Sequence, residues 1–537
     1  SLVVEWPNET ISIARNLSPD KTVEFFQTDA VKKPNLATSG LRTTVFTMEA
    51  LPPGVDFMHV ESSFVDFDKE RLLFNMLSNE GPCTCVADID GDGQDDFYIG
   101  GAKGQSGRLF RQTKDGEFQE TSSLVFEGDK EAEDTGCAFF DANGDNLPDL
   151  YVTSGSNEVP NISLALVDRL YINKGKGRFV KSQQILPTSA KLESTSVVRA
   201  MDYDNDGDTD LFVGVRMTPG FYGEQKNGYL LNNDGQGIFQ NVTIEFAPDL
   251  TSIGMITDAL WSDLDNDGAV DLVVVGDWMP IRVFLNRNGK FIEASDRSGL
   301  AGSSGWYHAV AAGDFNEDGL VDFVVGNHGL NSRFKASQFE PISMYINDFD
   351  RNGSKEQILT RYDGGKELPL VMRTDMVMQI PVLKKKYLRF KNYVGQGMDE
   401  AFTSEQISNS IILQVNDLSS QLLLNKGNGQ FSSQPLPLEA QFAPVYTLLV
   451  EDFDNDGHLD VFLGGNQYRA KPETGIYDAS YGLMLKGDGK GTLTSLKGAE
   501  SGIHTRGEIR SAQKIKVGKQ KMIVVGKNND VPEFYSY

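Results

Sequence analysis

Cysteine and histidine are scarce in this chain of 537 residues. Three cysteines, Cys83, Cys85 and Cys137, are too few for a disulfide framework, and their spacing fits no zinc-site pattern. We expect buried thiols, with a disulfide from Cys137 to Cys83 or Cys85 as the alternative. The five histidines form no pair at metal-ligand spacing.

Long apolar runs and catalytic motifs are also lacking. No stretch of about 18 apolar residues is present, so no transmembrane helix is expected. The first residues lack the basic start and apolar stretch of a signal peptide and resemble the middle of a strand, so we expect an export signal further upstream. There is no GxSxG elbow, HExxH or P-loop, and no sequence motif points to an enzyme.

Basic residues are outnumbered, with 50 Lys and Arg against 76 Asp and Glu. The formal charge of -26 argues against binding to nucleic acid or to anionic membrane surfaces. The 54 glycines and the 39% of hydrophobic residues are typical of a folded, turn-rich protein, for which an all-β fold is the natural expectation.

One acidic nine-residue pattern recurs along the chain. Its copies begin at Asp88, Asp141, Asp202, Asp263, Asp314 and Asp452, and each is followed by a short apolar strand such as FYIGG or LVVVGD. The intervals are 53, 61, 61, 51 and 138 residues, so four of them fit one repeated unit. The long interval indicates an insertion at about 327–420, partly helical, which carries another acidic loop from Asp348.

Each unit contains four predicted strands: one enters the acidic loop, one leaves it, and two flank a Gly-rich turn such as NKGKGRF. A seventh unit without acids follows at KIKVGKQKMIVVGKNND, from Lys514. We therefore predict an all-β, seven-bladed β-propeller with calcium-binding loops over 54–537. The last unit lacks a fourth strand, and we expect residues 54–63 (GVDFMHVESS) to pair with it and close the ring.

The acidic loops have the ligand chemistry of calcium, which takes six to eight oxygen ligands. Side chains at positions 1, 3 and 5 converge, position 7 offers its backbone carbonyl, position 9 closes the site, and Gly at position 6 permits the turn. Positions 1, 3, 5 and 9 of the seven loops hold 25 of the 76 acids, a clustering that is unfavourable without a cation. The predicted ligands, the insertion loop included, are Asp88, Asp90, Asp92, Gln94, Asp96, Asp141, Asn143, Asp145, Leu147, Asp149, Asp202, Asp204, Asp206, Asp208, Asp210, Asp263, Asp265, Asp267, Ala269, Asp271, Asp314, Asn316, Asp318, Leu320, Asp322, Asp348, Asp350, Asn352, Ser354, Glu356, Asp452, Asp454, Asp456, His458 and Asp460.

Strand order separates two faces of the predicted ring. The acidic loops and the Gly-rich turns share one face, and the loops between the second and third strands lie on the other. These opposite loops carry aromatic and arginine side chains, the usual anchors of binding surfaces. Packing between blades or against the insertion is the alternative. The candidate ligand-binding residues are Arg216, Phe221, Tyr222, Trp278, Tyr468, Arg469 and Tyr477.

The loops with their FVVGN-like strands resemble FG-GAP/VCBS repeats, as in integrin α-subunit propellers. GDWMPIRVFLN, GNHGLNSRFKAS and DFDRNGSKEQIL look like segments of bacterial ASPIC/UnbV-type (CRTAC-like) surface proteins. The opening VVEWPNETISIARNLSPDKTVEFF resembles the end of an ASPIC/UnbV domain, so residues 1–30 are expected to be the tail of that domain and 31–53 a linker. The resemblance implies the C-terminal part of a longer, exported protein, often an outer-membrane lipoprotein that accompanies SusC/SusD-type nutrient uptake.

Three functions remain open from the sequence. We expect a calcium-stabilised extracellular binding or adhesion module that recognises a glycan, a peptide or a partner protein on the face opposite the calcium loops. One alternative is a calcium-dependent polysaccharide lyase or hydrolase, because propellers that resemble this one occur in some lyases. Another is a structural component of an outer-membrane uptake assembly.

Overall fold

The computed structural model describes residues 2–6, 10–15, 22–32, 44–188 and 190–537, which form two compact units over residues 1–44 and 45–537. In the first unit, β1 (Leu2–Glu5), β2 (Thr10–Ala14) and β3 (Val31–Lys32) form an antiparallel sheet with the short helix η1 (Gln27–Asp29). None of the helices in the described residues has the length and apolarity needed to cross a membrane.

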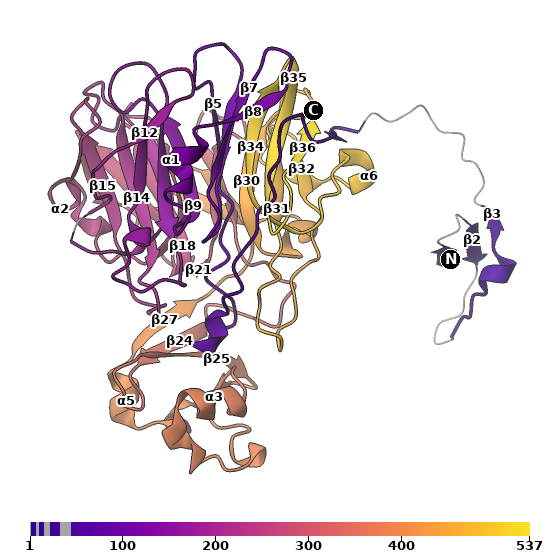
Figure 1. The fold of residues 1–537 in the computed structure, drawn as a ribbon. Coiled ribbons are helices and arrows are strands. Elements are labelled where there is room, and N and C mark those ends of the chain that lie inside the picture. The colour runs from indigo at the N-terminus through magenta and orange to yellow at the C-terminus, as the bar shows by residue number, and fades with distance from the viewer. Residues whose placement is uncertain (1, 7–9, 16–21, 33–43, 189) are drawn as a thin grey trace. The chain divides into compact units, whose positions relative to one another are not determined.

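The second unit is built mainly from antiparallel sheets of four strands, in which strands adjacent in sequence pair with each other (Figure 1). The strands that follow the acidic loops are almost wholly buried: Asp271–Met279 and Asp210–Met217, for example, are buried at every position. Apolar, β-branched residues on both faces of these strands pack between neighbouring sheets, which explains why the sequence shows apolar runs there instead of alternation.

The first four sheets follow the chain without interruption. Their strands are β5 (Thr84–Ala87), β6 (Asp96–Ile99), β7 (Arg108–Gln112) and β8 (Phe118–Thr121); β9 (Glu133–Phe140), β10 (Asp149–Gly155), β11 (Arg169–Asn173) and β12 (Phe179–Lys181); β13 (Ser194–Met201), β14 (Asp210–Met217), β15 (Gly228–Asn233) and β16 (Phe239–Asn241); and β17 (Met255–Ser262), β18 (Asp271–Met279), β19 (Arg282–Arg287) and β20 (Lys290–Glu293), with β21 (Gly305–Trp306) added to β18.

Three more sheets complete the series. Their strands are β22 (Ala309–Gly313), β23 (Asp322–Gly326), β28 (Gln421–Asn425) and β29 (Phe431–Pro435); β30 (Val445–Glu451), β31 (Asp460–Gly465), β32 (Leu483–Gly487) and β33 (Leu493–Ser495); and β34 (Glu508–Val517), β35 (Gln520–Asn528), β36 (Glu533–Ser536) and β4 (Thr47–Met48). Short helices lie in the connections: η2 (Asp66–Asp68), α1 (Ser123–Glu127), η3 (Leu164–Leu166), α2 (Thr243–Phe246), η4 (Pro248–Leu250), η7 (Leu438–Gln441) and α6 (Gly498–Ser501).

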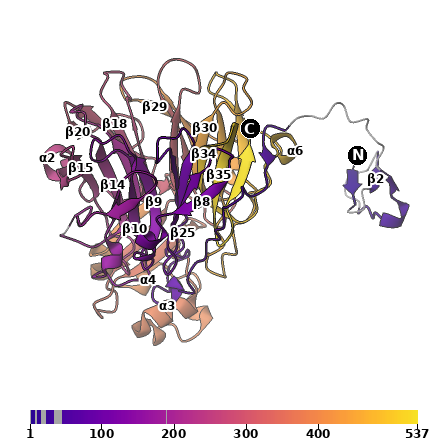
Figure 2. The same ribbon diagram turned by 45° about the horizontal axis from the view of Figure 1, so that its top comes forward.

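The first strands of successive sheets touch in cyclic order, from β5 through β9, β13, β17, β22 and β30 to β34, and β34 touches β5 again. Hydroxyl groups link these strands. Thr135 Oγ1 donates to the Thr195 carbonyl at 2.8 Å, and Ser196 Oγ donates to the Ile256 carbonyl at 2.7 Å. The sheets are thus arranged around a common axis, the arrangement of a β-propeller (Figures 1 and 2).

An N-terminal strand does complete the last sheet, but it is not the predicted one. Tyr535 and Ser536 of β36 pair with Met48 and Thr47 of β4, whereas residues 54–63 form no strand. These residues instead insert Val55 and Phe57 into the apolar cluster between the last sheet and the first. The closing strand was thus predicted some ten residues too late in the sequence. Both stretches carry apolar residues in alternation, and no local feature shows which of them pairs with β36 and which packs between the last sheet and the first.

The insertion lies between β23 and β28 and has a sheet of its own, in the order β26 (Lys366–Pro369), β25 (Glu356–Asp363), β24 (Ile342–Asn347) and β27 (Ile411–Val415). Its helices are short: α3 (Arg373–Gln379), η5 (Pro381–Lys384), η6 (Phe390–Asn392), α4 (Met398–Ala401) and α5 (Ser404–Ser408). Since β23 and β28 are the second and third strands of their sheet, the insertion extends from the face opposite the acidic loops (Figure 1).

Candidate metal centre and the opposite face

Each acidic loop is wrapped around its first carboxylate. In the first loop, the Asp88 carboxylate accepts backbone N–H groups from Gly91 at 2.8 Å, Asp92 at 3.1 Å and Gly93 at 2.8 Å. Position 6 has a positive φ, as predicted, with Gly93 at 83° and Asn146 in the same place of the second loop at 63°. Position 4 is left-handed as well, at Gly91 for example, a feature that the sequence pattern alone did not indicate.

The acid at position 9 connects the loop to the sheet. Asp96 Oδ2 accepts the Ile89 N–H at 2.9 Å, and Asp96 Oδ1 accepts the Gln112 N–H from β7 at 2.6 Å. The corresponding acids of the other five propeller loops accept the equivalent backbone N–H of the third strand, and all are fully buried: Asp149, Asp210, Asp271, Asp322 and Asp460. Glu356 of the insertion is buried too and accepts the Phe349 N–H.

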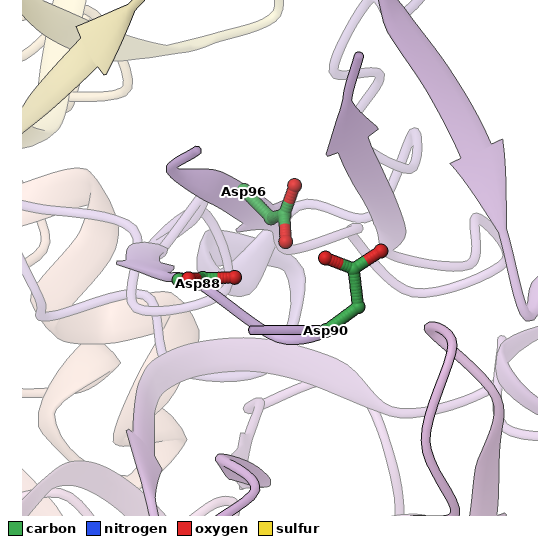
Figure 3. Close-up of side chains that lie close together, drawn as sticks. All are labelled: Asp88, Asp90 and Asp96. Atoms are coloured by element: carbon green, nitrogen blue, oxygen red, sulfur yellow. The ribbon is translucent and has the colours of Figure 1, made fainter. Parts of the chain in front are cut away.

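Three acidic side chains converge in five of the seven loops, with ligand atoms within 4.8 Å of one another. Figure 3 shows the carboxylates of Asp88, Asp90 and Asp96 turned toward a common centre. The five groups are Asp88, Asp90 and Asp96; Asp202, Asp204 and Asp206; Asp263, Asp265 and Asp271; Asp348, Asp350 and Glu356; and Asp452, Asp454 and Asp460. The insertion loop, whose acids are spaced like the others, therefore gathers its ligands as well as the propeller loops do.

The position-7 residues hold the position-5 side chains in place. The backbone N–H of Gln94 donates to Asp92 Oδ1 at 2.9 Å, and the same bond recurs at Leu147, Asp208, Ala269, Leu320, Ser354 and His458. Two loops have Asn at position 3, namely Asn143 and Asn316, and keep the same wrapping around Asp141 and Asp314. An amide oxygen is also a calcium ligand, so these loops remain candidates.

The electrostatics of the loops favour a bound cation. Burial, together with the neighbouring carboxylates, raises the pKa of Asp96 to about 7 and that of Glu356 to about 7. Several carboxylate oxygens are buried without a hydrogen-bond partner: Asp90 Oδ1, Asp210 Oδ2, Asp265 Oδ1, Asp350 Oδ1 and Glu356 Oε1. Such orphaned, partly negative oxygens are costly unless a cation coordinates them, and an all-oxygen donor set of this kind fits calcium.

Basic side chains from the third strands approach three of these loops. Arg287 pairs with Asp265 and with Asp267 at 2.6 Å, and Lys486 pairs with Asp454 and with Asp456 at 2.7 Å. Arg111 contacts Asp90 at 3.1 Å. These partners offset part of the acidic charge at their loops, while the loops from Asp202 and Asp348 have no such ion pair within the described residues.

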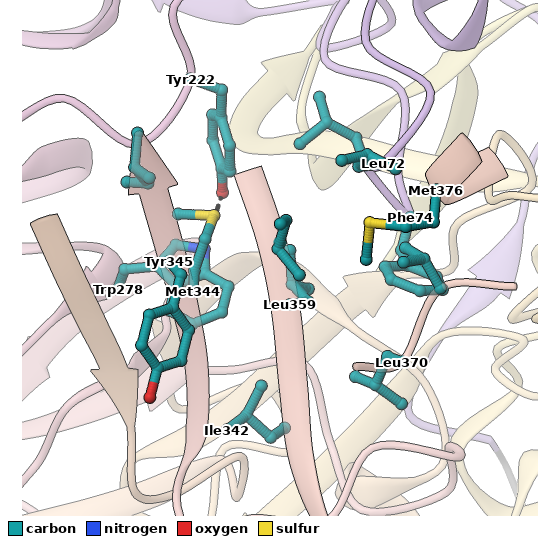
Figure 4. Close-up of a cluster of buried hydrophobic side chains, with 14 of the residues drawn as sticks. Leu72, Phe74, Tyr222, Trp278, Ile342, Met344, Tyr345, Leu359, Leu370 and Met376 are labelled. Atoms are coloured by element: carbon teal, nitrogen blue, oxygen red, sulfur yellow. Dashed lines mark hydrogen bonds between the residues drawn. The ribbon is translucent and has the colours of Figure 1, made fainter. Parts of the chain in front are cut away.

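On the opposite face, the structure buries four of the seven predicted ligand-binding residues. Tyr222, Trp278 and Tyr477 are 6–8% exposed and belong to one apolar cluster. In this cluster Tyr222 and Trp278 lie close to Met344, Leu359 and Met376 of the insertion (Figure 4). Trp278 Nε1 donates to Tyr222 Oη at 3.1 Å. This burial agrees with the alternative of packing against the insertion, which covers the loops that carry these residues. Phe221 is half-buried, and Tyr468 and Arg469 are exposed.

Arg216, the fourth buried residue, belongs to an ionic network that the sequence did not indicate. It pairs with Glu80 and with Asp277 at 2.7 Å, and Tyr222 Oη donates to the same Asp277 carboxylate at 3.2 Å. Arg216 also lines a cavity of about 200 Å³ along the first strands, together with His308, Tyr446 and Arg510. Its partners lie 136 and 61 positions away, so no sequence spacing could have revealed them.

The ring of antiparallel sheets and the acidic strand-to-strand loops define a β-propeller with candidate metal sites. The family model for the FG-GAP-like repeat matches residues 88–152, 154–213 and 263–325, which contain five of the six acidic propeller loops. These three segments of the β-propeller are therefore similar to the FG-GAP-like repeat. A search of curated proteins found no match.

Several solved structures are similar over most of the chain at low identity. The Vibrio cholerae biofilm matrix protein Bap1 is 10% identical, with a TM-score of 0.36, over 89% of this chain and 90% of that one. YCF48 bound to D1 peptide is 9% identical, with a TM-score of 0.39, over 86% and 95%. The exotype rhamnogalacturonan lyase YesX is 11% identical, with a TM-score of 0.40, over 92% and 75%. At these scores the likenesses identify no function.

Proposed function

We propose that this chain is a calcium-stabilised binding module of the cell surface, a seven-bladed propeller that binds Ca²⁺ in its six acidic loops and in the loop of the insertion. The observation that carries the proposal is the convergence of three acidic side chains in five loops, with buried oxygens that lack a partner. When bound, calcium would supply positive charge to these oxygens. The chain's own part is to fix each loop through its position-9 acid.

Calcium removal tests the structural role of the metal. A site that binds only the folded state stabilises it by about 2.7 kcal/mol at a free calcium concentration one hundred times Kd. Chelator should therefore lower the melting temperature substantially, and millimolar calcium should restore it, whereas magnesium should restore less because it demands stricter geometry. Metal analysis after dialysis should give seven calcium ions per chain. An unchanged melting curve in excess chelator would refute the structural role.

The recognition surface is the second part of the proposal. After the insertion has covered Tyr222 and Trp278, the loop between β31 and β32 still presents Tyr468, at 38% exposure, with Arg469 next to it, and Tyr481 at 53%. Exposed aromatic and arginine side chains on a rigid scaffold are suited to binding a glycan or a protein. We infer that this loop, and not the covered loops, makes the first contact with the ligand.

A glycan array and a pull-down from the native membrane would test this surface. The variant Y468A/R469A/Y481A should lose the ligand that the natural chain binds, and F339A, which removes an aromatic side chain that is 92% exposed in the insertion, serves as the matched control. Equal binding by all three proteins would exclude the loop as the site.

The remaining part of the proposal is that the protein is exported, is anchored at the outer membrane and associates with SusC/SusD-type proteins. The resemblance to ASPIC/UnbV-type surface proteins supports it. Co-purification with such partners would test it. The polysaccharide lyase remains the alternative, and screening acidic glycans for unsaturated products distinguishes it from a binding module.

A further inference from the structure

One segment of the insertion carries a local surplus of positive charge. Residues 372–394, here called the insertion tip, contain six Lys and Arg residues and a single acid, Asp375, although the whole chain has a formal charge of -26. The segment includes α3, η5 and η6. In Figure 1 it lies at the lower end of the unit, beyond the sheet of β24 to β27 and away from the blades. The basic residues are Arg373, Lys384, Lys385, Lys386, Arg389 and Lys391.

Two of these cations support the fold, and four face solvent. Arg373 Nε donates to the Tyr387 carbonyl at 2.6 Å, and Lys386 donates to the carbonyl of Glu400. Lys384, Lys385, Arg389 and Lys391 are exposed and form no ion pair or side-chain hydrogen bond with any residue that the structure describes. Their charge is therefore available to a partner.

Large apolar side chains accompany the free cations. Six of them in these 23 positions are about half exposed or more, whereas the other apolar residues of the segment form its small core around Met376 and Tyr387. Single exposed apolar residues are normal on a protein surface, but a group of six on one protruding segment is not. The six are Met372 at 49%, Met378 at 52%, Val382 at 61%, Leu388 at 72%, Phe390 at 55% and Val394 at 73%.

We propose that the insertion tip docks on the surface of an anionic lipid bilayer. Apolar side chains of this kind enter the boundary between headgroups and acyl chains, and flexible Lys and Arg side chains reach the lipid phosphates from the same segment. The acidity of the whole chain does not oppose this contact. The six acidic loops of the blades lie on the opposite face of the propeller, and charges are largely screened beyond about 8 Å at physiological ionic strength.

The composition of the tip favours lipid over a protein partner. Protein interfaces are depleted in Lys, and their anchors are packed Tyr, Trp and Arg side chains. The tip instead exposes four lysines beside aliphatic side chains and a single phenylalanine, with no exposed Tyr or Trp. Each Lys or Arg near an anionic membrane surface adds its own share of binding free energy and needs no fixed geometry. A fluid layer of lipid headgroups can therefore bind these side chains.

Vesicle co-sedimentation of the full chain in constant millimolar calcium tests the proposal. We expect binding to vesicles that contain phosphatidylglycerol, little binding to pure phosphatidylcholine, and weaker binding as salt rises. The variant K384Q/K385Q/R389Q should lower the partition coefficient at least tenfold and up to about a hundredfold. K174Q/K176Q/R178Q, which removes two lysines and one arginine that are exposed on the acidic-loop face, is the matched control and should bind normally.

A second pair of variants tests the apolar part. L388S/F390S/V394S should also weaken binding, whereas L124S/I162S/I244S, which replaces three residues that are 80–90% exposed elsewhere, should not. Melting curves in calcium check that all variants fold. The proposal is overturned if the natural chain does not bind anionic vesicles. It is also overturned if the tip variants and the control variants bind equally well, a result that would assign binding to calcium bridges at the acidic loops. Binding to an acidic protein column but not to vesicles would overturn it in favour of a protein partner.

Discussion

Ser511 in β34 donates a hydrogen bond from its Oγ to the carbonyl oxygen of Pro82 at 2.9 Å. Pro82 precedes the first strand of the first sheet, and Ser511 belongs to the first strand of the last sheet, 429 residues later. The same hydroxyl lies 2.8 Å from Thr84 Oγ1. Thr135, Ser196 and Thr257 donate equivalent hydroxyl-to-carbonyl hydrogen bonds between successive sheets. Ser511 therefore makes the same kind of hydrogen bond where the last sheet meets the first.

Replacing Ser511 with alanine should lower the free energy of unfolding by about 1 kcal/mol, the usual net contribution of one hydrogen bond, with some added cost for the Pro82 carbonyl that loses its partner. Urea denaturation in saturating calcium measures the difference. S433A, at an exposed serine in β29, is the control and should leave the midpoint unchanged. An unaltered midpoint in both variants would show that this link does not stabilise the closed ring.

A single loop can be disabled without touching the others. D265N removes the negative charge of a position-3 side chain in the loop from Asp263, and the calcium count should fall by one while the other sites keep their affinity. The melting temperature in calcium should fall because that site no longer contributes its share, up to about 2.7 kcal/mol at one hundred times Kd. D115N changes an exposed acid in a Gly-rich turn and should alter neither quantity. Metal analysis and calorimetry give both numbers.

The ion pair of Lys486 with Asp454 and Asp456 should compete with calcium at the loop from Asp452. In K486M the loop has one positive charge fewer, so it should bind calcium several-fold more tightly, while the chelated protein should become less stable by up to about 1 kcal/mol. Isothermal titration with calcium and melting in chelator measure the two effects, which have opposite signs. A loss of calcium affinity would mean that Lys486 helps to orient the carboxylates and does not compete.

Acid should destabilise the protein in part through His328. Burial lowers the pKa of His328 to about 3, against an ordinary value of 6.5, and the ring is packed against Trp306, Phe334 and Tyr477. Below pH 6.5 the unfolded chain binds a proton that the folded chain does not. This histidine therefore costs about 1.4 kcal/mol of stability for each pH unit from 6.5 down toward 3.

The measurement compares the pH dependence of the unfolding free energy in H328L and in the natural chain. H328L should be less sensitive to pH between 6.5 and 4, whatever its stability at pH 7, and H504L, at an exposed histidine, should follow the natural chain. Parallel curves for all three proteins would show that His328 is already accessible to protons in the folded state.

The repeat and the candidate metal loops could be predicted from the sequence, because all the groups that one loop needs stand within nine consecutive residues. Asp88 accepts N–H groups three to five positions ahead, and its chemistry does not depend on distant parts of the chain. The insertion was predicted for the same reason, as a gap in the spacing of a local pattern. The partner of Asp96 in β7, Gln112, was not predictable, since the register between strands fixes it.

Long-range packing decided the features that the sequence left open or misplaced. Residues 54–63 and Thr47–Met48 both precede the first sheet, and only the position of β36 selects the latter as the closing strand. From the sequence, Trp278 and Tyr222 are candidate anchors of a binding surface, but in the structure the insertion packs over them. The three cysteines, for which a disulfide remained open, are free thiols in one apolar cluster.

By itself, then, the sequence determined the β-rich repeat, the carboxylate chemistry of each loop and the place of the insertion, since short-range spacing encodes them all. Only the tertiary structure decided which side chains are accessible, which strand completes the last sheet and which charges remain unpaired. These depend on surfaces brought together from positions tens to hundreds of residues apart, as in Ser511 and Pro82, and no local pattern records such contacts.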